Sequence, residues 1–302
     1  MTGAVAEGLA FRCSALSRAL GESPAATAST VRSWFLLEQP GPWGPDIPGQ
    51  SRLPHQVAQS LRAAAQLGIR IVLIRRHGRS DPATRHCYLS WTSPRGHWLE
   101  HAVLDSPWDV LGADLEMLAR GDPPGLGTVD EGPLFLVCTN GRRDPCCAEQ
   151  GRPLARALDR EFGDRAWECS HIGGDRFAGN LVCLPHGLYF GRLDPASGPR
   201  VARAYAAGRI DLEHYRGRAA YDFPVQAAEH FLRQALGLTG IDDVALSGRE
   251  RRPDGVVVAR FAGPSGSLHA VAVELVPVEP RRLTCHAHDL GRPRSFRLVG
   301  LD

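Results

Sequence analysis

The sequence predicts an α/β protein made of two similar halves followed by a small α+β region. Strand-like and helix-like segments alternate from about residue 34, and the same order recurs after a Gly/Pro-rich linker at 121–127. The remainder of the chain carries strand-like runs behind one amphipathic helix. With 302 residues the chain is too long for one average domain. We expect three regions, residues 1–125, 126–210 and 211–302.

The first half shows the order β-α-β-β-β-α. Apolar residues at helical spacing predict its first helix, and Ser106 followed by Pro107 gives the N-cap and first-turn signals of its second. The expected elements are a strand at 34–38, a helix at 54–67, a strand at 69–74, a hairpin at 88–91 and 97–99, and a helix at 107–120.

The second half repeats this order, which is the core order of a thioredoxin-like fold. Its expected elements are a strand at 134–137, a loop at 139–147, a helix at 153–162, a strand at 166–170, a hairpin at 180–184 and 188–192, and a helix at 199–209. The sequence therefore predicts two tandem thioredoxin-like halves. The third region is expected to hold a helix at 224–236 and strands at 255–261, 268–276 and 295–301.

The composition excludes several classes of protein. All 35 basic residues are arginines, yet the formal net charge is only +2, which argues against a nucleic-acid-binding chain. The absence of lysine excludes a lysine Schiff base. No apolar run approaches the roughly 20 residues of a membrane span, and the N-terminus carries Glu7 and no long apolar core. We therefore expect a cytoplasmic protein with neither a membrane segment nor a signal peptide.

Eight cysteines stand in what we expect to be a reducing compartment, where thiols and metal ligands are commoner than disulfides. Three of them, Cys138, Cys146 and Cys147, lie within ten residues. Four others are interpreted as small packing residues: Cys13, Cys87, Cys183 and Cys285. The tract from Cys285 to His288 looks like a metal motif, but it has no matching partners nearby in the sequence.

One set of residues has the chemistry of a metal centre. Cys138 ends a predicted strand, Cys147 precedes a helix, and His171 ends the next strand, with Asp175 four residues later. Thiolates together with an imidazole suit zinc or an iron–sulfur cluster. The tight C-x₂₋₄-C pair of structural zinc sites is absent, which favours a cluster, although the spacing leaves zinc open.

Four short motifs make the sequence similar to a known family. They are Cys138-x₈-Cys147 with Gly-Arg-Arg-Asp inside it, Ser-His-Ile-Gly-Gly at 170–174, Arg-Phe-Ala-Gly-Asn at 176–180 and Leu-Tyr-Phe-Gly-Arg at 188–192. They resemble the sucrase/ferredoxin-like family, whose members have a thioredoxin-like ferredoxin domain that holds a [2Fe–2S] cluster. Nothing in the sequence resembles the paired carboxylates of a glycosidase, so we expect no sucrase activity.

The resemblance implies that Cys138 and Cys147 bind one iron and that His171 binds the other. Family members with two histidine ligands carry His-x₃-His, and here the second position is Asp175. Asp175 is the preferred fourth ligand, and Cys169 is its main rival because alternation puts it on the same strand face as His171. Near the cluster loop, three arginines either offset its negative charge, dock an acidic partner or form a solvated face: Arg142, Arg143 and Arg176.

The function that follows is that of an electron carrier rather than an enzyme. Its partner is expected to be a redox protein, either a reductase or an electron acceptor, with no role for nucleic acid or membrane. Two other interpretations stay open. One is a thiol–disulfide or peroxide-linked redox enzyme that uses Cys138, Cys146 and Cys147, and the other is a zinc-stabilised binding module.

Overall fold

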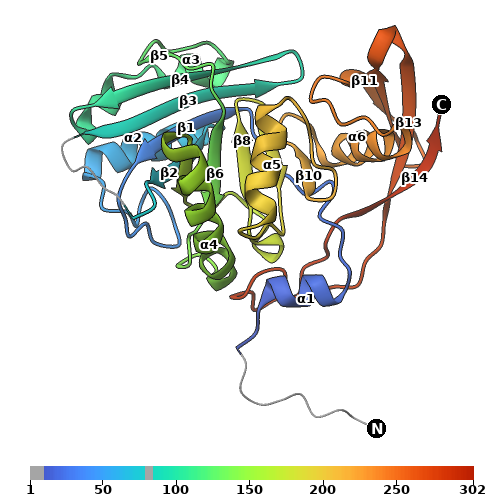
Figure 1. Ribbon diagram of the computed structural model, residues 1–302, viewed down its shortest axis with the longest axis horizontal. Coiled ribbons are helices and arrows are strands. Elements are labelled where there is room, and N and C mark those ends of the chain that lie inside the picture. The colour runs from blue at the N-terminus through green and yellow to red at the C-terminus, as the bar shows by residue number, and fades with distance from the viewer. Residues whose placement is uncertain (1–9, 79–83) are drawn as a thin grey trace.

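The structure is a computed structural model, and it describes residues 10–78 and 84–302. The start of the chain around Glu7, on which the expectation about a signal peptide depends, lies outside the described residues. The chain forms a mixed α/β protein with one curled ten-stranded sheet and a smaller antiparallel sheet of four strands (Figure 1). The predicted α/β class is therefore confirmed at this level.

The first half contributes five strands to the large sheet and carries three helical segments. Strands β1 and β2 are parallel, whereas β3 and β4 follow as an antiparallel hairpin beside β1. The two-residue strand β5 forms the outer edge. The bounds are β1 Ser33–Glu38, α2 His55–Gln66, β2 Arg70–Arg75, β3 Arg85–Ser93, β4 Gly96–Leu104, the 3-10 helix η1 Pro107–Gly112, α3 Leu115–Arg120 and β5 Thr128–Val129.

The second half pairs its strands in the same way. Strands β6 and β7 are parallel, and β8 and β9 follow as antiparallel strands beside β6. The bounds are β6 Leu134–Cys138, α4 Pro145–Phe162, η2 Gly163–Arg165, β7 Ala166–Cys169, η3 Asp175–Phe177, β8 Leu181–Leu184, β9 Leu188–Phe190 and α5 Ser197–Ala206. The strand order of the whole sheet is β10-β9-β8-β6-β7-β2-β1-β3-β4-β5.

The two halves join through the antiparallel strands β2 and β7, so that they share a single sheet. At this seam the buried carboxylate of Glu168 holds the guanidinium of Arg75 at 2.6 Å, the ring of His77 at 2.7 Å and the hydroxyl of Thr139 at 2.8 Å. A charge this well enclosed is stable only with such partners. The seam is thus held by ionic contacts as well as by backbone hydrogen bonds.

Alternation along the strands divides the apolar side chains between the two faces of the curled sheet. On one face, Trp34, Leu36, Leu134, Leu136 and Trp167 form a core common to both halves. On the other face, α2 packs over the first half, and α4 and α5 pack over the second. These helices therefore pack on one face of the curled sheet, and the other face forms the core that both halves share.

The C-terminal region adds one strand to the large sheet and builds the smaller one. Strand β10 (Tyr215–Arg218) pairs with β9, and α6 (Phe223–Leu236) packs between β10 and the small sheet. The small sheet has the order β11-β12-β13-β14, with bounds Ala245–Arg251, Val257–Ala262, Leu268–Val276 and Ser295–Leu301. The helix and three of these strands match the predicted ranges closely, whereas β11 was not predicted.

Two predicted helices are wrong in their extent. Helix α4 begins at Pro145 rather than at residue 153, because Asp144 caps it by accepting a hydrogen bond from the Cys146 N–H at 2.9 Å. Pro153 lies inside the helix instead of starting it. The helix predicted at 107–120 is split into η1 and α3, since Asp114 caps a new helix by accepting from the Met117 N–H.

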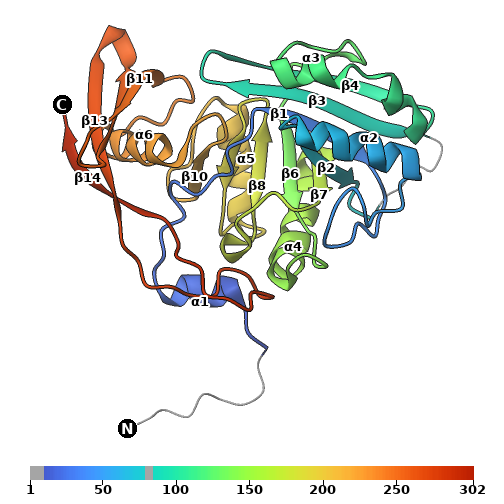
Figure 2. The same cartoon turned by 180° about the vertical axis from the view of Figure 1, so that it is seen from behind.

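A further helix, α1 (Cys13–Ala19), precedes β1 in the chain and packs against η3 of the second half. Both views show it beside the segment that connects β13 to β14 (Figures 1 and 2). Its Cys13 contacts Cys146 in the first turn of α4. Residues from near both ends of the chain thereby reach the start of α4. None of the described helices combines the length and the apolar composition that crossing a bilayer requires.

Candidate metal centre

The candidate centre lies where β6 and β7 end and α4 begins. Cys138 is the last residue of β6 and stands opposite Cys169 of β7 in the parallel register. Cys147 lies in the first turn of α4, not in a loop as the sequence had suggested. Helix and strand approach very closely here, because a Cβ on Gly151 would lie 2.0 Å from the carbonyl oxygen of Cys138. A glycine one turn beyond Cys147 thus brings the two thiols together.

His171 and Asp175 come from the turn between β7 and η3. Gly173 and Gly174 have φ angles of +97° and +80°, which side chains other than glycine rarely adopt. The carbonyl groups of this turn are held from outside by side chains, since Arg216 donates to Gly173 at 3.0 Å and Asn180 donates to Gly174 at 2.9 Å. The turn is therefore fixed by the sheet around it.

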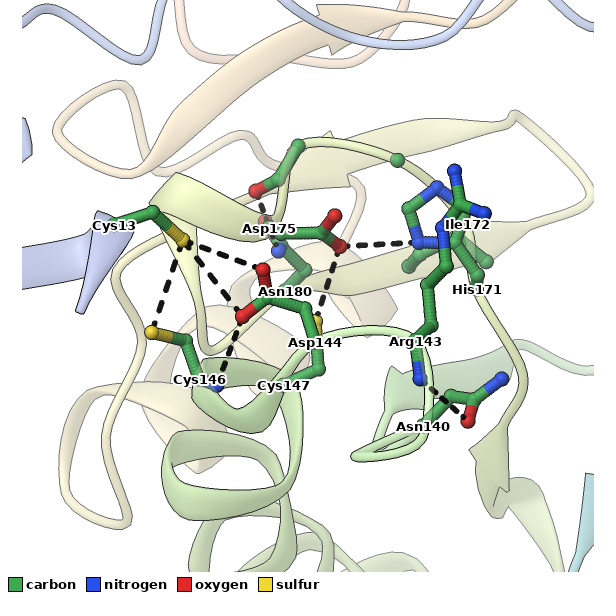
Figure 3. Close-up of polar contacts among 12 residues, drawn as sticks. Cys13, Asn140, Arg143, Asp144, Cys146, Cys147, His171, Ile172, Asp175 and Asn180 are labelled. Atoms are coloured by element: carbon green, nitrogen blue, oxygen red, sulfur yellow. Dashed lines mark hydrogen bonds and ion pairs between the residues drawn. The ribbon is translucent and has the colours of Figure 1, made fainter. Parts of the chain in front are cut away.

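Three of the four predicted ligands meet at one carboxylate oxygen (Figure 3), and the fourth, Cys138, lies next to Cys147. Oδ1 of Asp175 lies 3.2 Å from Sγ of Cys147 and 3.0 Å from Nδ1 of His171. Cys138, Cys147 and Asp175 are almost fully buried, whereas the His171 side chain is 24% exposed. Among the four, the imidazole is the group that meets solvent.

The pKa values show how strongly these groups interact. The hydrogen bond with Cys147 lowers the pKa of the Cys138 thiol, although burial opposes this. The same hydrogen bond, together with burial, raises the pKa of Cys147 well above its usual range. Burial alone would raise the pKa of Asp175, but the close contact with His171 and the charge of its ring outweigh burial and hold that pKa below normal. An anionic group beside a thiol pair is a setting suited to a cation.

Cys169, the rival fourth ligand, lies in the same buried cluster as Cys138 and Cys147. It is fully buried, and burial raises its pKa well above the usual range. Its charge would interact with that of Cys138, so the two side chains are near each other. In the described part of the chain we find no hydrogen bond to its thiol, in contrast to the two close contacts of Asp175.

The three predicted arginines are not equivalent. Arg143 is exposed beside His171, and its charge contributes to the low pKa of Asp175 (Figure 3). Arg142 is exposed on the loop and lines a different cavity, next to Arg152. Arg176 points away from the loop, because it pairs with Glu22 at 2.8 Å and stacks on Phe177.

One arginine at the candidate metal centre was not predicted from the sequence. Arg70, from β2 of the first half, donates a hydrogen bond to the carbonyl oxygen of His171 at 2.8 Å. With Arg143 and His171 it lines a surface cavity of about 420 Å³. No local signal marks Arg70, because it becomes a neighbour of His171 only when β2 pairs with β7.

A second group of potential ligands lies behind the first. Cys13, Asp144, Cys146 and Cys285 are all buried, and their thiol and carboxylate atoms lie within 4.8 Å of one another, so that this group could hold a metal ion. Cys13 and Cys285, interpreted from the sequence as packing residues, are buried, and both also belong to this group. The tract at Cys285 has no partners nearby in the sequence because its partners come from segments more than a hundred residues away.

The chain was compared with known proteins. A model of the sucrase/ferredoxin-like family matches residues 24–217. The chain belongs to the sucrase/ferredoxin-like family. The resemblance seen in the sequence motifs is thereby confirmed. The match includes Cys138, Cys147, His171 and Asp175, whereas Cys13 and Cys285 fall outside it. No curated protein and no solved structure matched the chain.

The residues present fit an iron–sulfur cluster. Two thiols, an imidazole and a carboxylate are donors that iron accepts, and here they come together in a buried setting. Nδ1 of His171 is buried and has no aligned hydrogen-bond partner among the described residues, although it lies close to Asp175. A buried nitrogen without a hydrogen bond is costly, and a metal would satisfy it.

Proposed function

We propose that this member of the sucrase/ferredoxin-like family is an electron-transfer protein that carries a [2Fe–2S] cluster. Cys138 and Cys147 hold one iron, and His171 and Asp175 hold the other. The observation that carries the proposal is the convergence of these four side chains at the ends of β6 and β7. The contacts of Asp175 with both Cys147 and His171 favour it over Cys169 as the fourth ligand.

The bound cluster would supply reversible one-electron chemistry. The chain's own residues control access to it. Burial of both thiols and of Asp175 keeps water away, and the part-exposed imidazole of His171 offers the shortest path to a partner. Arg70 fixes the backbone of His171, and together with Arg143 it gives the adjoining cavity a positive rim. An acidic face on a reductase or an electron acceptor would be attracted to this rim.

We also propose that the large sheet consists of two tandem thioredoxin-like halves, the second of which is the ferredoxin domain. Both halves pair a parallel β-α-β unit with an antiparallel hairpin on the same side, which supports this. In the first half the residues after β1 are Gln39 to Gly44, which contain no cysteine. That half would be a cluster-free copy, and the protein would act in the cytoplasm, where thiols stay reduced.

The test is spectroscopic and uses the full chain purified without oxygen. The proposal predicts a red-brown protein with visible absorption, two irons and two acid-labile sulfides per chain, and an electron paramagnetic resonance signal on one-electron reduction. Cys138→Ala should remove the absorption. Cys183→Ala, which changes a buried thiol elsewhere in the sheet, should keep it.

A colourless wild-type chain would contradict the proposal. If zinc at one equivalent disappears with Cys138→Ala, the centre is a zinc site instead. If the colourless chain holds no metal and its thiols turn over with a disulfide or a peroxide, a thiol enzyme replaces the electron carrier.

A further inference from the structure

Three thiols from three distant parts of the chain meet behind the candidate centre. Cys13 comes from α1, Cys146 from the first turn of α4, and Cys285 from the segment between β13 and β14. Their sulfur atoms form a nearly equilateral triangle, with Cys13 and Cys146 at 3.7 Å, Cys146 and Cys285 at 3.4 Å, and Cys13 and Cys285 at 3.6 Å. All three are free thiols, and none is more than 9% exposed.

These distances are those of ligands around one tetrahedral ion. With Zn–S bonds of about 2.3 Å, neighbouring sulfurs of a tetrahedral site lie about 3.8 Å apart, close to each side of the triangle. A disulfide would need a separation of about 2.05 Å, and it would leave the third thiol over. In a [2Fe–2S] cluster at most two cysteines share one iron, so a third thiol would lie farther away, across the bridging sulfides.

Asp144 completes the tetrahedron. Its two carboxylate oxygens lie 3.6 and 3.7 Å from Sγ of Cys13, and a zinc site with one oxygen ligand at about 2.1 Å places oxygen and sulfur about 3.6 Å apart. The carboxylate is fully buried, and in the described part of the chain it forms no ion pair. It accepts hydrogen bonds from the backbone N–H groups of Cys146, at 2.9 Å, and Cys285, at 2.7 Å, and from the thiol of Cys13. All of these donors are neutral, so a cation beside the buried carboxylate would be favourable.

Two of the three sulfurs accept hydrogen bonds from donors that are not thiols. The hydroxyl of Ser14 donates to Sγ of Cys146 at 3.2 Å, and the backbone N–H of Cys13 donates to Sγ of Cys285 at 3.4 Å. Cys146 also lies in the first turn of an 18-residue helix, whose N-terminal end stabilises negative charge. Donors of this kind around the sulfurs are typical of metal–thiolate sites.

We propose that Cys13, Cys146, Cys285 and Asp144 bind one zinc ion in a structural site. Each thiol gives up its proton when the ion binds, and the three thiolates with the carboxylate leave the same formal charge as a four-cysteine zinc site. The ion ties α1 and the segment before β14 to the start of α4. Because Cys147 follows Cys146 directly, the zinc site also fixes the helix turn that presents Cys147 to the candidate centre (Figure 3).

The test measures zinc and iron in the same samples of the full chain, expressed with both metals supplied. Wild type should contain one equivalent of zinc besides any iron. Cys285→Ala should lose that zinc, and the matched control Cys183→Ala, which alters a fully buried thiol in β8, should keep it. Cys138→Ala should keep the zinc while losing the iron. Zinc that survives in Cys285→Ala, or that is lost in Cys138→Ala, overturns the proposal.

A second measurement covers the case in which Cys285→Ala does not fold. Cobalt(II) exchanged into wild-type protein should give intense thiolate-to-metal charge-transfer absorption with tetrahedral d–d bands. In Cys13→His, which keeps a ligand at that position, the charge-transfer intensity should fall by about a third, because two of three thiolates remain. Unchanged intensity in this variant, or octahedral cobalt in wild type, overturns the proposal. The zinc result does not depend on iron, so the [2Fe–2S] proposal can fail while this site stands.

Discussion

Replacing Asp175 by histidine should raise the reduction potential of the cluster. The change exchanges an anionic ligand for a neutral one, so the added electron meets one negative charge less. A unit charge at the 3.2 Å that separates Asp175 Oδ1 from Cys147 Sγ interacts by about 5 kcal/mol at an effective dielectric constant of about 20. For one electron this corresponds to roughly 220 mV. Exchanging two thiolates for two histidines raises the potential of [2Fe–2S] proteins by roughly 250–700 mV, or about half of that per ligand.

We therefore expect Asp175→His to raise the potential by roughly 100–300 mV, measured by spectroelectrochemical titration at fixed pH. The visible absorption should persist, because the resemblance to the family implies a histidine at this position in relatives. Cys169→Ala is the matched variant and should leave the potential within about 20 mV of wild type, because its thiol is not a ligand. An unchanged potential in Asp175→His, together with a shift or loss of the cluster in Cys169→Ala, would assign the ligand to Cys169 and refute the reasoning.

Two further predictions concern the framework of the site. Glu168→Gln should lower the free energy of unfolding by about 3 kcal/mol, as judged by denaturant titration, whereas the exposed Glu116→Gln should change it by less than about 0.5 kcal/mol. Burial would raise the pKa of Glu168, but Arg75 holds that pKa below normal. The difference in the free energy of unfolding between wild type and Glu168→Gln should therefore be full above about pH 5 and shrink as the pH falls below about 4. Gly151→Ala should destabilise the chain by about 1–3 kcal/mol and disturb the cluster's spectrum, since its Cβ would strike a strand carbonyl. A Cβ at Gly248 would meet open space, so Gly248→Ala should change neither the stability of the chain nor the cluster's spectrum. If the two alanine variants lose the same stability, the close contact between Gly151 and the strand carbonyl does not matter.

Local patterns in the sequence were sufficient for most elements. The period of apolar residues marks β1, α2 and β6, and the motifs around Cys138 and His171 place the candidate ligands at strand ends. The start of α4 was missed because Pro153 was taken for a first-turn proline, although Asp144-Pro145 carries the same signal eight residues earlier. This error also put Cys146 and Cys147 in a loop.

Contacts between distant segments could not be predicted in this way. Cys13 and Cys285 stand 272 residues apart, and each looks like a packing residue in its own surroundings. Arg70 likewise belongs to an ordinary buried strand until the seam between β2 and β7 is formed. Both cases need knowledge of which segments become neighbours, and hydrophobic periodicity does not contain it.

The first half has no cysteine in the loop after β1, but through the seam between β2 and β7 it contacts the candidate centre. Leu73 of β2 exchanges hydrogen bonds with Ser170, its O accepting the Ser170 N–H at 2.8 Å and its N–H donating to Oγ at 2.9 Å. Asn140, on the loop between the two cysteines, donates to the Gly44 carbonyl of the first half at 3.0 Å, and Arg70 holds His171. The first half therefore supports both the cysteine loop and the histidine turn. On this basis the first half would shape and shield the candidate centre, whose candidate ligands all come from the second half.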